Sequence, residues 1–580
     1  MQEVEVKLTT VIAAREAKIV RIHRQPNEIV NRGDALFDLE GNKETATLYA
    51  QVSGKMVALE VAEGDVVPTG SVLARIEVGD EEVVSVGEGE EATIPEKEKP
   101  SFDYLGGLLR PQTEHVDTDI AILGAGPGGY VAAIQAAQLG ASVVLIEKGK
   151  VGGTCLNWGC IPTKALVRSA EVYKTLRQSE EYGCYAGDLR LDMGRVISRK
   201  QQVVDQLVRG IHLLLRANRV ELIEGVGSLN DQHTVSVRRG HREILISSRY
   251  IIIATGSRAS NLPIPGMDIP NVLDSKKALE LRDLPERMVI IGGGIIGMEF
   301  AFIFSNFGVK VSVVEYLDRI LGGCDIDICQ EMGRVTRQQG IHIYTSAEAD
   351  AIDQAEDGQC VVTFSQRQER KYLTAGKVLV AIGREPDLTG VDLGRLGIEP
   401  NDTGRGIKTN EYMQTNIPHI YAIGDVTDEI QLAHVASRQG IVAVRHILGQ
   451  GITMDYSAVP SAIFTDPEIA LVGLSEAEAK EKGIPIEVGR FPFMGNGKAL
   501  TYGETRGFVK AIRHRDSGKM VGAAIVGPNA TDLIAELTLA IQYGLTAEQV
   551  ANTIHAHPTT TEAIHEAILA TMGGAIHSAT

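Results

Sequence analysis

One arrangement of elements occurs twice in this 580-residue chain: an apolar strand, a glycine-rich turn, a helix, and a second strand that ends in glutamate. The first turn reads GAGPGG and the second reads GGGIIG. The distance from the first glycine to the terminal glutamate is 23 positions in both copies, from Gly124 to Glu147 and from Gly292 to Glu315. Because the strand, turn, helix and acid keep this register twice, chance is a poor explanation. The chain is therefore expected to contain two similar parallel α/β units.

This arrangement meets the physical requirements of a dinucleotide site. Glycines allow a tight turn and let the backbone approach a pyrophosphate, whose charge faces the free N–H groups of the helix N-terminus. Glu147 and Glu315 are placed to accept hydrogen bonds from ribose hydroxyls, and Glu315 would repel a 2′-phosphate, which favours NAD over NADP. Turns used only for chain packing are the alternative. The candidate glycines are Gly124, Gly126 and Gly129 in the first turn and Gly292, Gly294 and Gly297 in the second.

The pattern changes along the chain, which is too long for a single core. From about 116 to 457, apolar strands alternate with amphipathic helices, whereas the last 120 residues are typical of an α+β unit. We therefore predict an α/β fold with two Rossmann-like dinucleotide-binding domains and a C-terminal α+β domain, preceded by a small all-β sandwich. The predicted boundaries are 1–79 for the sandwich, 80–115 for an acidic linker, 116–262 and 389–457 for the two parts of the first dinucleotide-binding domain, 263–388 for the second, and 458–580 for the C-terminal domain.

The first 80 residues repeat a pattern at an offset of 37 positions: AKIV at 17–20 overlays GKMV at 54–57. Two similar strand-turn-strand halves predict the all-β sandwich. Between the halves, Lys43 lies in a polar turn. This arrangement resembles lipoyl and biotinyl domains, whose modified lysine lies on that turn. Asn42 stands where biotinyl domains have Met, so the resemblance favours a lipoyl group on Lys43; an ordinary solvated lysine is the alternative.

Composition excludes several classes of partner. The formal net charge of −18 argues against nucleic acid and anionic membranes, because both are polyanions. Residues 1–30 carry charges throughout, and no run of 18 apolar residues occurs, so we expect no secretion signal, no membrane span and a cytoplasmic location. Six cysteines are too few for a disulfide scaffold in a chain of this size. Any disulfide is therefore expected to be catalytic.

Cys155 and Cys160 lie in the stretch GGTCLNWGCIPTK, which follows the first α/β unit. In an ideal helix, Cα atoms five residues apart are about 8.7 Å from each other, and a disulfide needs roughly 4.4–6.8 Å. The helix must therefore bend if the two cysteines pair, and Gly153, Gly159 and Pro162 provide places for the bend. Two unpaired structural cysteines are the alternative.

This stretch is similar to the redox motif of dihydrolipoamide dehydrogenases, and the resemblance extends from about 116 to 566. It implies that Cys160 faces a flavin as the charge-transfer thiolate and that Cys155 exchanges with the substrate dithiol. It also implies an ion pair between Lys164 and Glu299 beside the flavin, and places Gly383 on the nicotinamide or flavin side. Without the resemblance, the two charged residues would pass for surface charges.

Two further strand ends favour a flavin. The strands 251–253 and 420–422 are short and apolar, and each is followed by small or acidic residues. Asp425 can bond a ribityl or ribose hydroxyl, whereas a buried aspartate without a partner would be costly. In flavin-dependent disulfide reductases the similar segments close over FAD, which implies FAD contacts for Thr255, Gly256 and Asp425.

His557 and Glu562 form a candidate base and its orienting carboxylate in the stretch HAHPTTTE. Thiol–disulfide exchange needs a thiolate attacker, so a histidine that accepts the thiol proton speeds the step near neutral pH. A helix-cap histidine is the alternative, and a metal pair of His555 and His557 is disfavoured because no third ligand is suggested by local spacing. In the enzymes that the chain resembles, this pair acts on the partner subunit, which implies a homodimer formed through the C-terminal dimerisation domain.

The sequence therefore predicts an enzyme that oxidises dihydrolipoamide with FAD and NAD. Its partners would be dihydrolipoamide on its own or a partner lipoyl domain and the subunits of a 2-oxo acid dehydrogenase, acetoin or glycine cleavage complex. The alternatives are a reductase similar to glutathione or mercuric reductases, or a lipoyl-carrier or assembly subunit. Glu315 fits poorly with the NADPH preference of the first alternative, and no cysteine follows Cys360, unlike in mercuric reductases.

Overall fold

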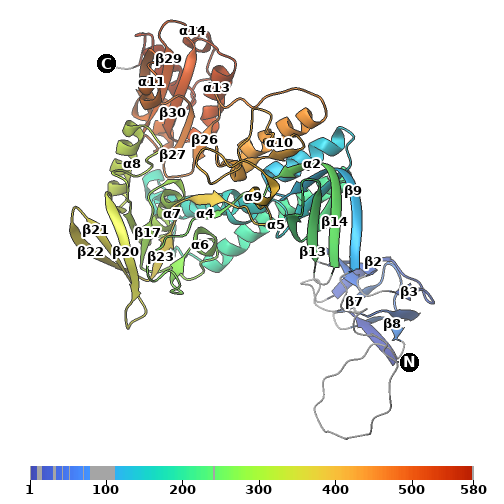
Figure 1. Cartoon of the computed structure of the whole chain (residues 1–580). Helices are drawn as coiled ribbons and strands as arrows, with labels where there is room; N and C mark the ends of the chain where they lie inside the picture. Colours follow the sequence, from blue (N-terminus) through green and yellow to red (C-terminus); the bar gives the residue numbers. More distant parts are fainter. Residues whose placement is uncertain are drawn as a thin grey trace. The chain divides into compact units, whose positions relative to one another are not determined.

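The computed structural model describes residues 2–8, 16–30, 34–41, 44–50, 52–68, 71–78, 112–239 and 242–577 (Figure 1). The chain forms two compact units, Met1–Tyr104 and Leu105–Thr580. Each unit has its own buried apolar core. Among the helices of these described ranges, none is both long and apolar enough to cross a membrane.

The N-terminal unit is a sandwich of antiparallel sheets, with strand orders β1-β8-β6-β3 and β5-β4-β2-β7. Side chains from both sheets, among them Ile19, Phe37, Met56 and Ile76, pack into one core. This arrangement confirms the predicted all-β sandwich. The strands are β1 (Gln2–Lys7), β2 (Glu16–Ile22), β3 (Ile29–Val30), β4 (Ala35–Gly41), β5 (Glu44–Tyr49), β6 (Gly54–Leu59), β7 (Val66–Pro68) and β8 (Val72–Val78).

The offset of 37 positions has a structural counterpart. The bounds of β4 and β8 differ by this offset at both ends, and β4 pairs with β2 just as β8 pairs with β6 in the other sheet. Each half also contributes one short strand, β3 or β7, to the sheet of the other half. Neither half therefore completes a sheet by itself, which explains why the pattern occurs twice.

The β4–β5 hairpin marks the position predicted for modification. Gly41 lies opposite Glu44 in the antiparallel pair. Asn42 and Lys43, the two residues between these strands, lie outside the described residues.

In the C-terminal unit, the first sheet has the order β11-β10-β9-β14-β13-β12, with β25 beside β14. Its centre is parallel, because β9 pairs in that sense with both β10 and β14. β9 begins at Gln112, inside the range predicted as linker, because its first residues pair with the start of β14. The strands are β9 (Gln112–Leu123), β10 (Val143–Glu147), β11 (Glu221–Glu224), β12 (Val226–Leu229), β13 (Thr234–Arg239), β14 (Arg242–Ile253) and β25 (Ile420–Ala422).

Helices from distant parts of the sequence pack around this sheet. Figure 1 shows α10 beside α2, and their buried residues share one core with the sheet. The helices of these parts of the chain, of which α4 packs into the core of the second sheet, are α2 (Pro127–Gln138), α3 (Gly153–Trp158), α4 (Cys160–Arg177), η1 (Ser179–Tyr182), α5 (Met193–Ala217), α9 (Leu393–Leu396), η2 (Gly424–Thr427) and α10 (Ala433–Ile447).

The second parallel sheet has the order β16-β23-β17-β18-β19, and an antiparallel sheet β20-β21-β22 packs against it. Two short strands form an antiparallel ribbon where the chain passes between the two sheets: β15 follows β14 of the first sheet, and β24 follows β23 of the second. The elements are β15 (Ser257–Ala259), β16 (Val272–Leu273), α6 (Ser275–Ala278), β17 (Arg287–Ile291), α7 (Ile295–Asn306), β18 (Lys310–Val314), α8 (Ile326–Gln338), β19 (His342–Tyr344), β20 (Ala347–Gln354), β21 (Cys360–Gln366), β22 (Glu369–Ala375), β23 (Lys377–Val380) and β24 (Arg384–Pro386).

The C-terminal part is an antiparallel sheet, β26-β27-β30-β29-β28, packed with helices (Figure 1). The predicted fold class, with two Rossmann-like units followed by an α+β unit, is therefore confirmed. The elements are β26 (Ser461–Ile463), β27 (Glu468–Gly473), α11 (Glu476–Glu481), β28 (Ile486–Pro492), η3 (Phe493–Gly495), α12 (Gly497–Tyr502), β29 (Phe508–His514), β30 (Met520–Gly527), α13 (Ala530–Gln542), α14 (Ala547–Ala551) and α15 (Glu562–Ala570).

The first glycine-rich turn joins β9 to α2 by close backbone contacts. Gly124 has a φ of +103°, which favours glycine, and a Cβ there would lie 2.3 Å from the carbonyl oxygen of Ala254. A Cβ at Gly129 would lie 1.8 Å from the carbonyl oxygen of Gly124. By contrast, no described atom lies within 4 Å of a Cβ placed at Gly126. Two of the glycines therefore serve the packing of the turn, and the third leaves open space.

We expect Gly129→Ala to lower the stability of the protein, because the added methyl group must push the turn away from α2. The cost should be about 1–3 kcal/mol, as for other overpacked sites. Gly126→Ala is the matched control and should leave the thermal unfolding midpoint of the ligand-free protein nearly unchanged. Equal midpoints for the two variants would contradict this account of the turn.

Candidate active site

The second glycine-rich turn repeats the geometry of the first. Gly292 has a φ of +107°, and a Cβ there would lie 2.4 Å from the carbonyl oxygen of Ala381. A Cβ at Gly297 would lie 1.9 Å from the carbonyl oxygen of Gly292, whereas the space at Gly294 is open to 4 Å among the described atoms. Both helices that follow begin without a side-chain cap, at Gly126 for α2 and Gly294 for α7. Their leading N–H groups are therefore free to bind an anionic group.

The two terminal glutamates also match. Glu147 is buried, and its carboxylate accepts hydrogen bonds from the backbone N–H groups of Ala125 and Gly149, both at 2.7 Å. Glu315 is likewise buried and accepts from Gly293 N and from Leu317 N, the latter at 2.7 Å. Sequence reasoning missed this contact, in which each carboxylate holds the middle of its own glycine-rich turn. Carboxylate oxygens have further lone pairs, so binding of a ribose hydroxyl remains compatible with it.

The helix that carries the two cysteines is broken between them. α3 ends at Trp158 and α4 begins at Cys160, because the dihedral angles of Gly159 (φ −138°, ψ −110°) are not helical. This is one of the positions at which the sequence predicts a bend. Cys155 and Cys160 are both partly exposed thiols in the structure.

The two thiols are electrostatically unequal. A hydrogen bond from the Cys155 thiol lowers the pKa of Cys160 to about 7, against the effect of burial, and the Lys164 ammonium group adds to this shift. The same hydrogen bond and burial raise the pKa of Cys155. Cys160 is also the first residue of α4, where the helix N-terminus stabilises a thiolate. These contacts all favour a thiolate at Cys160 over one at Cys155 in the reduced pair.

Lys164 and Glu299 form the predicted ion pair. The Lys164 Nζ lies 3.0 Å and 3.1 Å from the two carboxylate oxygens of Glu299, which is 5% exposed. The backbone N–H of Phe464 donates to the same carboxylate at 2.9 Å, and the Phe464 ring centroid lies 4.3 Å from Lys164 Nζ. The pair thus joins α4 to α7 and to the loop after β26.

The ends of β14 and β25 lie close together, as expected from their parallel pairing. Asp425 accepts a hydrogen bond from the Ser257 hydroxyl at 2.5 Å. Gly256 has a φ of +75° and open space around a built Cβ, at least among the described atoms. The hydroxyl of Thr255 is buried, and none of the described residues provides it with a hydrogen-bond partner. These strand ends therefore present an unused polar atom and free space to a ligand.

Arg384, which sequence reasoning missed, lies among these residues. Its guanidinium donates to the Ser257 hydroxyl at 2.8 Å and to the Ser257 carbonyl oxygen at 2.6 Å. Burial lowers the pKa of Arg384, although charges at Asp425 and Cys160 oppose the shift. The one signal in the sequence is that Arg384 directly follows Gly383, a predicted site residue. In the structure, Gly383 has a φ of +123° and its carbonyl oxygen accepts from Ser260 N at 3.0 Å.

The chemistry of this region fits FAD. A free helix N-terminus and the open space at Gly126 suit a pyrophosphate. The unpartnered Thr255 hydroxyl and the neighbouring Asp425 suit the polar groups of a flavin nucleotide. The turn at Gly292 with Glu315 offers the same type of site to a second dinucleotide.

His557 and Glu562 are hydrogen-bonded to each other, with 2.9 Å between His557 Nδ1 and a Glu562 carboxylate oxygen. The other oxygen of Glu562 accepts from Thr559 N at 3.0 Å. Burial raises the pKa of Glu562, but the hydrogen bonds from His557 and Thr559 outweigh it, so that this pKa is lowered overall. The His557 side chain is 79% exposed, which leaves its Nε2 accessible.

The structure does not bring this pair to the two cysteines of the same chain. Within the described part of the chain, no hydrogen bond or ion pair joins His557 or Glu562 to Cys155 or Cys160. Lys43, the predicted attachment site, lies outside the described residues. Among the described residues, those predicted for the active site therefore form two groups: one around the redox pair and one at the start of α15, where Glu562 holds His557.

Comparisons with known proteins agree with this geometry. Residues 118–440 match the family described as "Pyridine nucleotide-disulphide oxidoreductase", and 459–568 match the dimerisation domain of that family. Residues 4–76 match the family described as "Biotin-requiring enzyme", whose model covers biotinyl and lipoyl domains.

Several relatives are similar over most of the chain. A dihydrolipoyl dehydrogenase of Haloferax volcanii is 44% identical over 467 residues, which cover 80% of this chain and 98% of the relative. One of Bacillus subtilis is 44% identical over 79% of this chain and 99% of its own length. Among solved structures, LpdA from Mycobacterium tuberculosis has a TM-score of 0.73 at 27% identity, and the flavoprotein disulfide reductase RclA from Escherichia coli has 0.70 at 30%. For both solved structures, the match covers 78% of this chain and 99% of the solved chain. The chain therefore belongs to the pyridine nucleotide-disulphide oxidoreductase family.

Proposed function

We propose that this flavoprotein oxidises dihydrolipoamide to lipoamide and reduces NAD⁺ to NADH. The observation that carries the proposal is the thiol pair at the break between α3 and α4, where a hydrogen bond from Cys155 and the Lys164 ammonium group lower the pKa of Cys160 and the pKa of Cys155 is raised. The relatives that match over nearly their whole length are named dihydrolipoyl dehydrogenases, and their family uses FAD and a pyridine nucleotide. These cofactors fit the two glycine-rich turns described above.

The proposed chemistry begins at His557, which accepts a proton from a thiol of dihydrolipoamide while Glu562 holds the imidazole. The resulting thiolate attacks Cys155 in the oxidised Cys155–Cys160 pair, and Cys160 leaves as a thiolate. The second substrate thiol then displaces Cys155, so that lipoamide leaves and both enzyme cysteines are reduced. Bound FAD supplies a two-electron path from this pair to NAD⁺.

The role of Lys164 and Glu299 in this scheme is electrostatic. The Lys164 ammonium group lowers the pKa of Cys160 and so stabilises the thiolate that leaves Cys155. Glu299 compensates the charge of Lys164 and fixes its position by two hydrogen bonds. We assign the FAD contacts to Gly124, Gly126, Gly129, Glu147, Thr255, Gly256 and Asp425, and the NAD contacts to Gly292, Gly294, Gly297 and Glu315, with Gly383 between them.

We further propose that His557 and Glu562 act on the redox pair of the partner subunit. This follows from their separation from the cysteines within one chain and from the match to a dimerisation domain. We also propose a cytoplasmic location, because so few cysteines fit a reducing compartment. The domain boundaries given above are part of the same proposal, with the start of the first dinucleotide-binding domain moved to Gln112.

The N-terminal unit supports a role within a 2-oxo acid dehydrogenase, acetoin or glycine cleavage complex. A lipoyl group on Lys43 would carry the dithiol on the same chain, which raises its effective concentration at an active site. The match of 4–76 to a biotinyl and lipoyl family supports this proposal.

Purified protein with bound FAD should reduce NAD⁺ when dihydrolipoamide is added, and should prefer NAD⁺ to NADP⁺ because of Glu315. NADH formation, followed by absorbance, measures this activity. Cys155→Ser should abolish it and keep the flavin spectrum, since Cys155 contacts the substrate and not the dinucleotide turn. Rapid reduction of glutathione disulfide or mercuric ion, without oxidation of dihydrolipoamide, would contradict the assignment.

His557→Gln should lower kcat/KM for dihydrolipoamide by about 10²–10⁴-fold, because the substrate thiol loses its proton acceptor. His577→Gln is a matched control. His577 is similarly exposed, at 72%, and bonds Glu566 on the same helix at 2.7 Å. Comparable losses of kcat/KM in the two variants would show that His557 supports the structure around α15 and does not accept the proton of the substrate thiol.

Expression in cells with lipoylation enzymes should add one lipoyl group per chain, which intact-mass measurement detects. Lys43→Arg should remove the added mass. Lys55→Arg changes an exposed lysine of β6 in the same unit and should retain it. An unmodified wild-type chain under these conditions would exclude the carrier role but not the oxidoreductase activity.

A further inference from the structure

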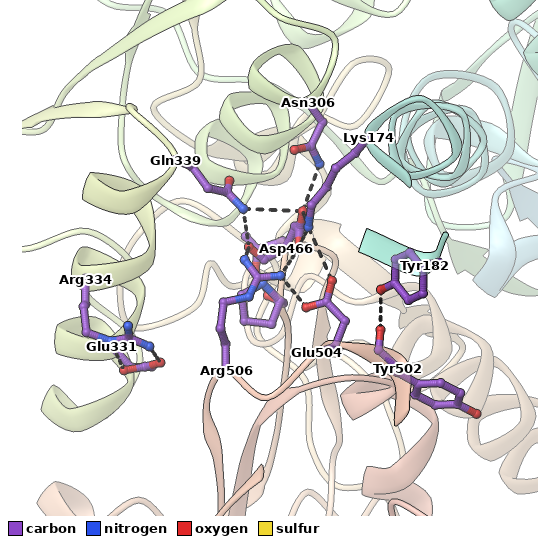
Figure 2. Close-up of polar contacts among 12 residues, drawn as sticks. Lys174, Tyr182, Asn306, Glu331, Arg334, Gln339, Asp466, Tyr502, Glu504 and Arg506 are labelled. Atoms are coloured by element: carbon purple, nitrogen blue, oxygen red, sulfur yellow. Dashed lines mark hydrogen bonds and ion pairs between the residues drawn. The ribbon is translucent and has the colours of Figure 1, made fainter. Parts of the chain in front are cut away.

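A cluster of charged and amide side chains surrounds Asp466, in the loop between β26 and β27 (Figure 2). None of the functions proposed above uses this cluster. The Asp466 carboxylate accepts from Lys174 Nζ at 2.8 Å and 3.1 Å and from Arg506 at 2.7 Å. Arg506 also donates to Glu504 at 2.5 Å. Two cations and two anions therefore lie within one hydrogen-bonded group.

Two amides complete the cluster. Asn306 Nδ2 donates to the Asp466 carboxylate at 3.1 Å, and Gln339 Nε2 lies 3.3 Å from the Asp466 carbonyl oxygen. Figure 2 shows both side chains pointing toward Asp466 from the side opposite Arg506. Donors from several directions thus replace the hydrogen bonds that water would make to the Asp466 carboxylate.

These contacts join elements that are far apart in the sequence. Lys174 lies near the end of α4, Asn306 is the last residue of α7, and Gln339 directly follows α8. Asp466 and Arg506 belong to loops of the C-terminal α+β part. One carboxylate therefore ties the helix of the redox pair and the helices of the second dinucleotide-binding unit to the C-terminal part.

The charges of the cluster stabilise one another. Burial raises the pKa of this carboxyl, but Lys174, Arg506 and their hydrogen bonds outweigh burial, so that its pKa is lowered. Burial lowers the pKa of Arg506, but the carboxylates of Asp466 and Glu504 outweigh burial, so that this pKa is raised. Removal of one buried partner from such a group leaves the others uncompensated, which is costly.

Asp466 is two residues from Phe464, which contacts the active-site ion pair. Phe464 N donates to Glu299, and the Phe464 ring lies against Lys164 Nζ. Thr465 between them is buried, and its hydroxyl donates to the Pro467 carbonyl oxygen at 2.7 Å. The segment 464–466 therefore contacts α4 and α7 at both ends, near the ion pair and about 15 Å further along α4.

We propose that Asp466 is a positioning residue for the redox pair: through the segment 464–466 it holds the Lys164–Glu299 ion pair in the place where Lys164 stabilises the Cys160 thiolate. The inference rests on the proposed function for the flavin beside Cys160 and for the role of that thiolate, and not for the identity of the substrate. The charged and titratable groups that face Cys160 are Cys155, Lys164, Glu299 and Arg384. Of these, Lys164 and Glu299 depend on the segment for their positions.

The test is the pH dependence of the Cys160 thiolate in the FAD-bound protein reduced with dithiothreitol. The long-wavelength charge-transfer absorbance of thiolate and flavin reports the thiolate directly. In Asp466→Asn, one of the two acceptor oxygens is replaced by an NH2 group, and the side chain lacks the charge that Lys174 and Arg506 require. We expect the midpoint of the titration to rise by about 0.5–1 pH unit, because Lys164 is less well placed.

The sign of this shift separates positioning from direct charge. Loss of a negative charge at residue 466, acting at a distance alone, would stabilise the thiolate and lower the midpoint. Asn306→Ala removes a single hydrogen bond to the carboxylate and should raise the midpoint by a smaller amount. This second variant keeps the test informative if Asp466→Asn does not fold. A lowered midpoint in Asp466→Asn, or unchanged midpoints in both variants, would overturn the proposal.

Asp325→Asn is the matched control. Asp325 is also a buried aspartate bonded to a lysine, with 2.6 Å to Lys510 Nζ, and it also joins α8 to the C-terminal part. It has no contact with the segment 464–466 among the described residues. We expect this variant to lower the unfolding temperature and to leave the thiolate midpoint unchanged. If the thiolate midpoint shifted as much in this variant as in Asp466→Asn, general destabilisation would explain both shifts, and the proposal would be overturned. Because dithiothreitol is the reductant, these outcomes stand whether or not dihydrolipoamide is the substrate.

Discussion

Burial of the Glu299 carboxylate is the constraint on which the arrangement of the active site depends. A carboxylate that is 5% exposed must find charged or hydrogen-bonding partners, because an unpaired buried charge is costly. Lys164 and the backbone N–H of Phe464 supply them, and these partners come from α4 and from the loop after β26. Three parts of the chain must therefore meet at one point. The lysine that satisfies Glu299 is the same group that stabilises the Cys160 thiolate.

The break at Gly159 gives that thiolate its other support. A continuous helix would place Cys160 in its interior, where N–H groups are already bonded. Because α4 starts afresh at Cys160, the sulfur lies at a helix N-terminus and within reach of Cys155. Helix N-terminus, thiol donor and ammonium group all favour the charge on one sulfur. The asymmetry of the pair thus follows from the backbone as well as from its charged neighbours.

Apart from the Lys164–Glu299 ion pair, which the family resemblance implied, the features of the site that the sequence predicted are carried by short stretches of chain. The glycine-rich turns, the bend near Gly159 and the pairing of His557 with Glu562 each depend on residues close in sequence. The sequence did not predict a role for Arg384, because its contacts are with Ser257, which lies 127 positions away. The carboxylate of Glu147 was expected to face a ribose, but its contacts with the turn could be seen only once β9 and β10 were paired. The Asp466 cluster has no local pattern at all, since its members come from distant helices and loops.

The separation of the redox pair from His557 has a mechanistic consequence. His557 is exposed and its orientation is fixed from one side, by Glu562, so the side that must meet a substrate thiol is open. In the proposed mechanism, this base on the C-terminal part would act on the Cys155–Cys160 pair of a second subunit, which would complete the site. The free energy of dimer formation then also positions the catalytic groups. The segment 464–466 belongs to this same C-terminal part and contacts the ion pair of its own subunit. The C-terminal part would therefore serve two redox pairs: it supports one through Glu299 and supplies the base for the other.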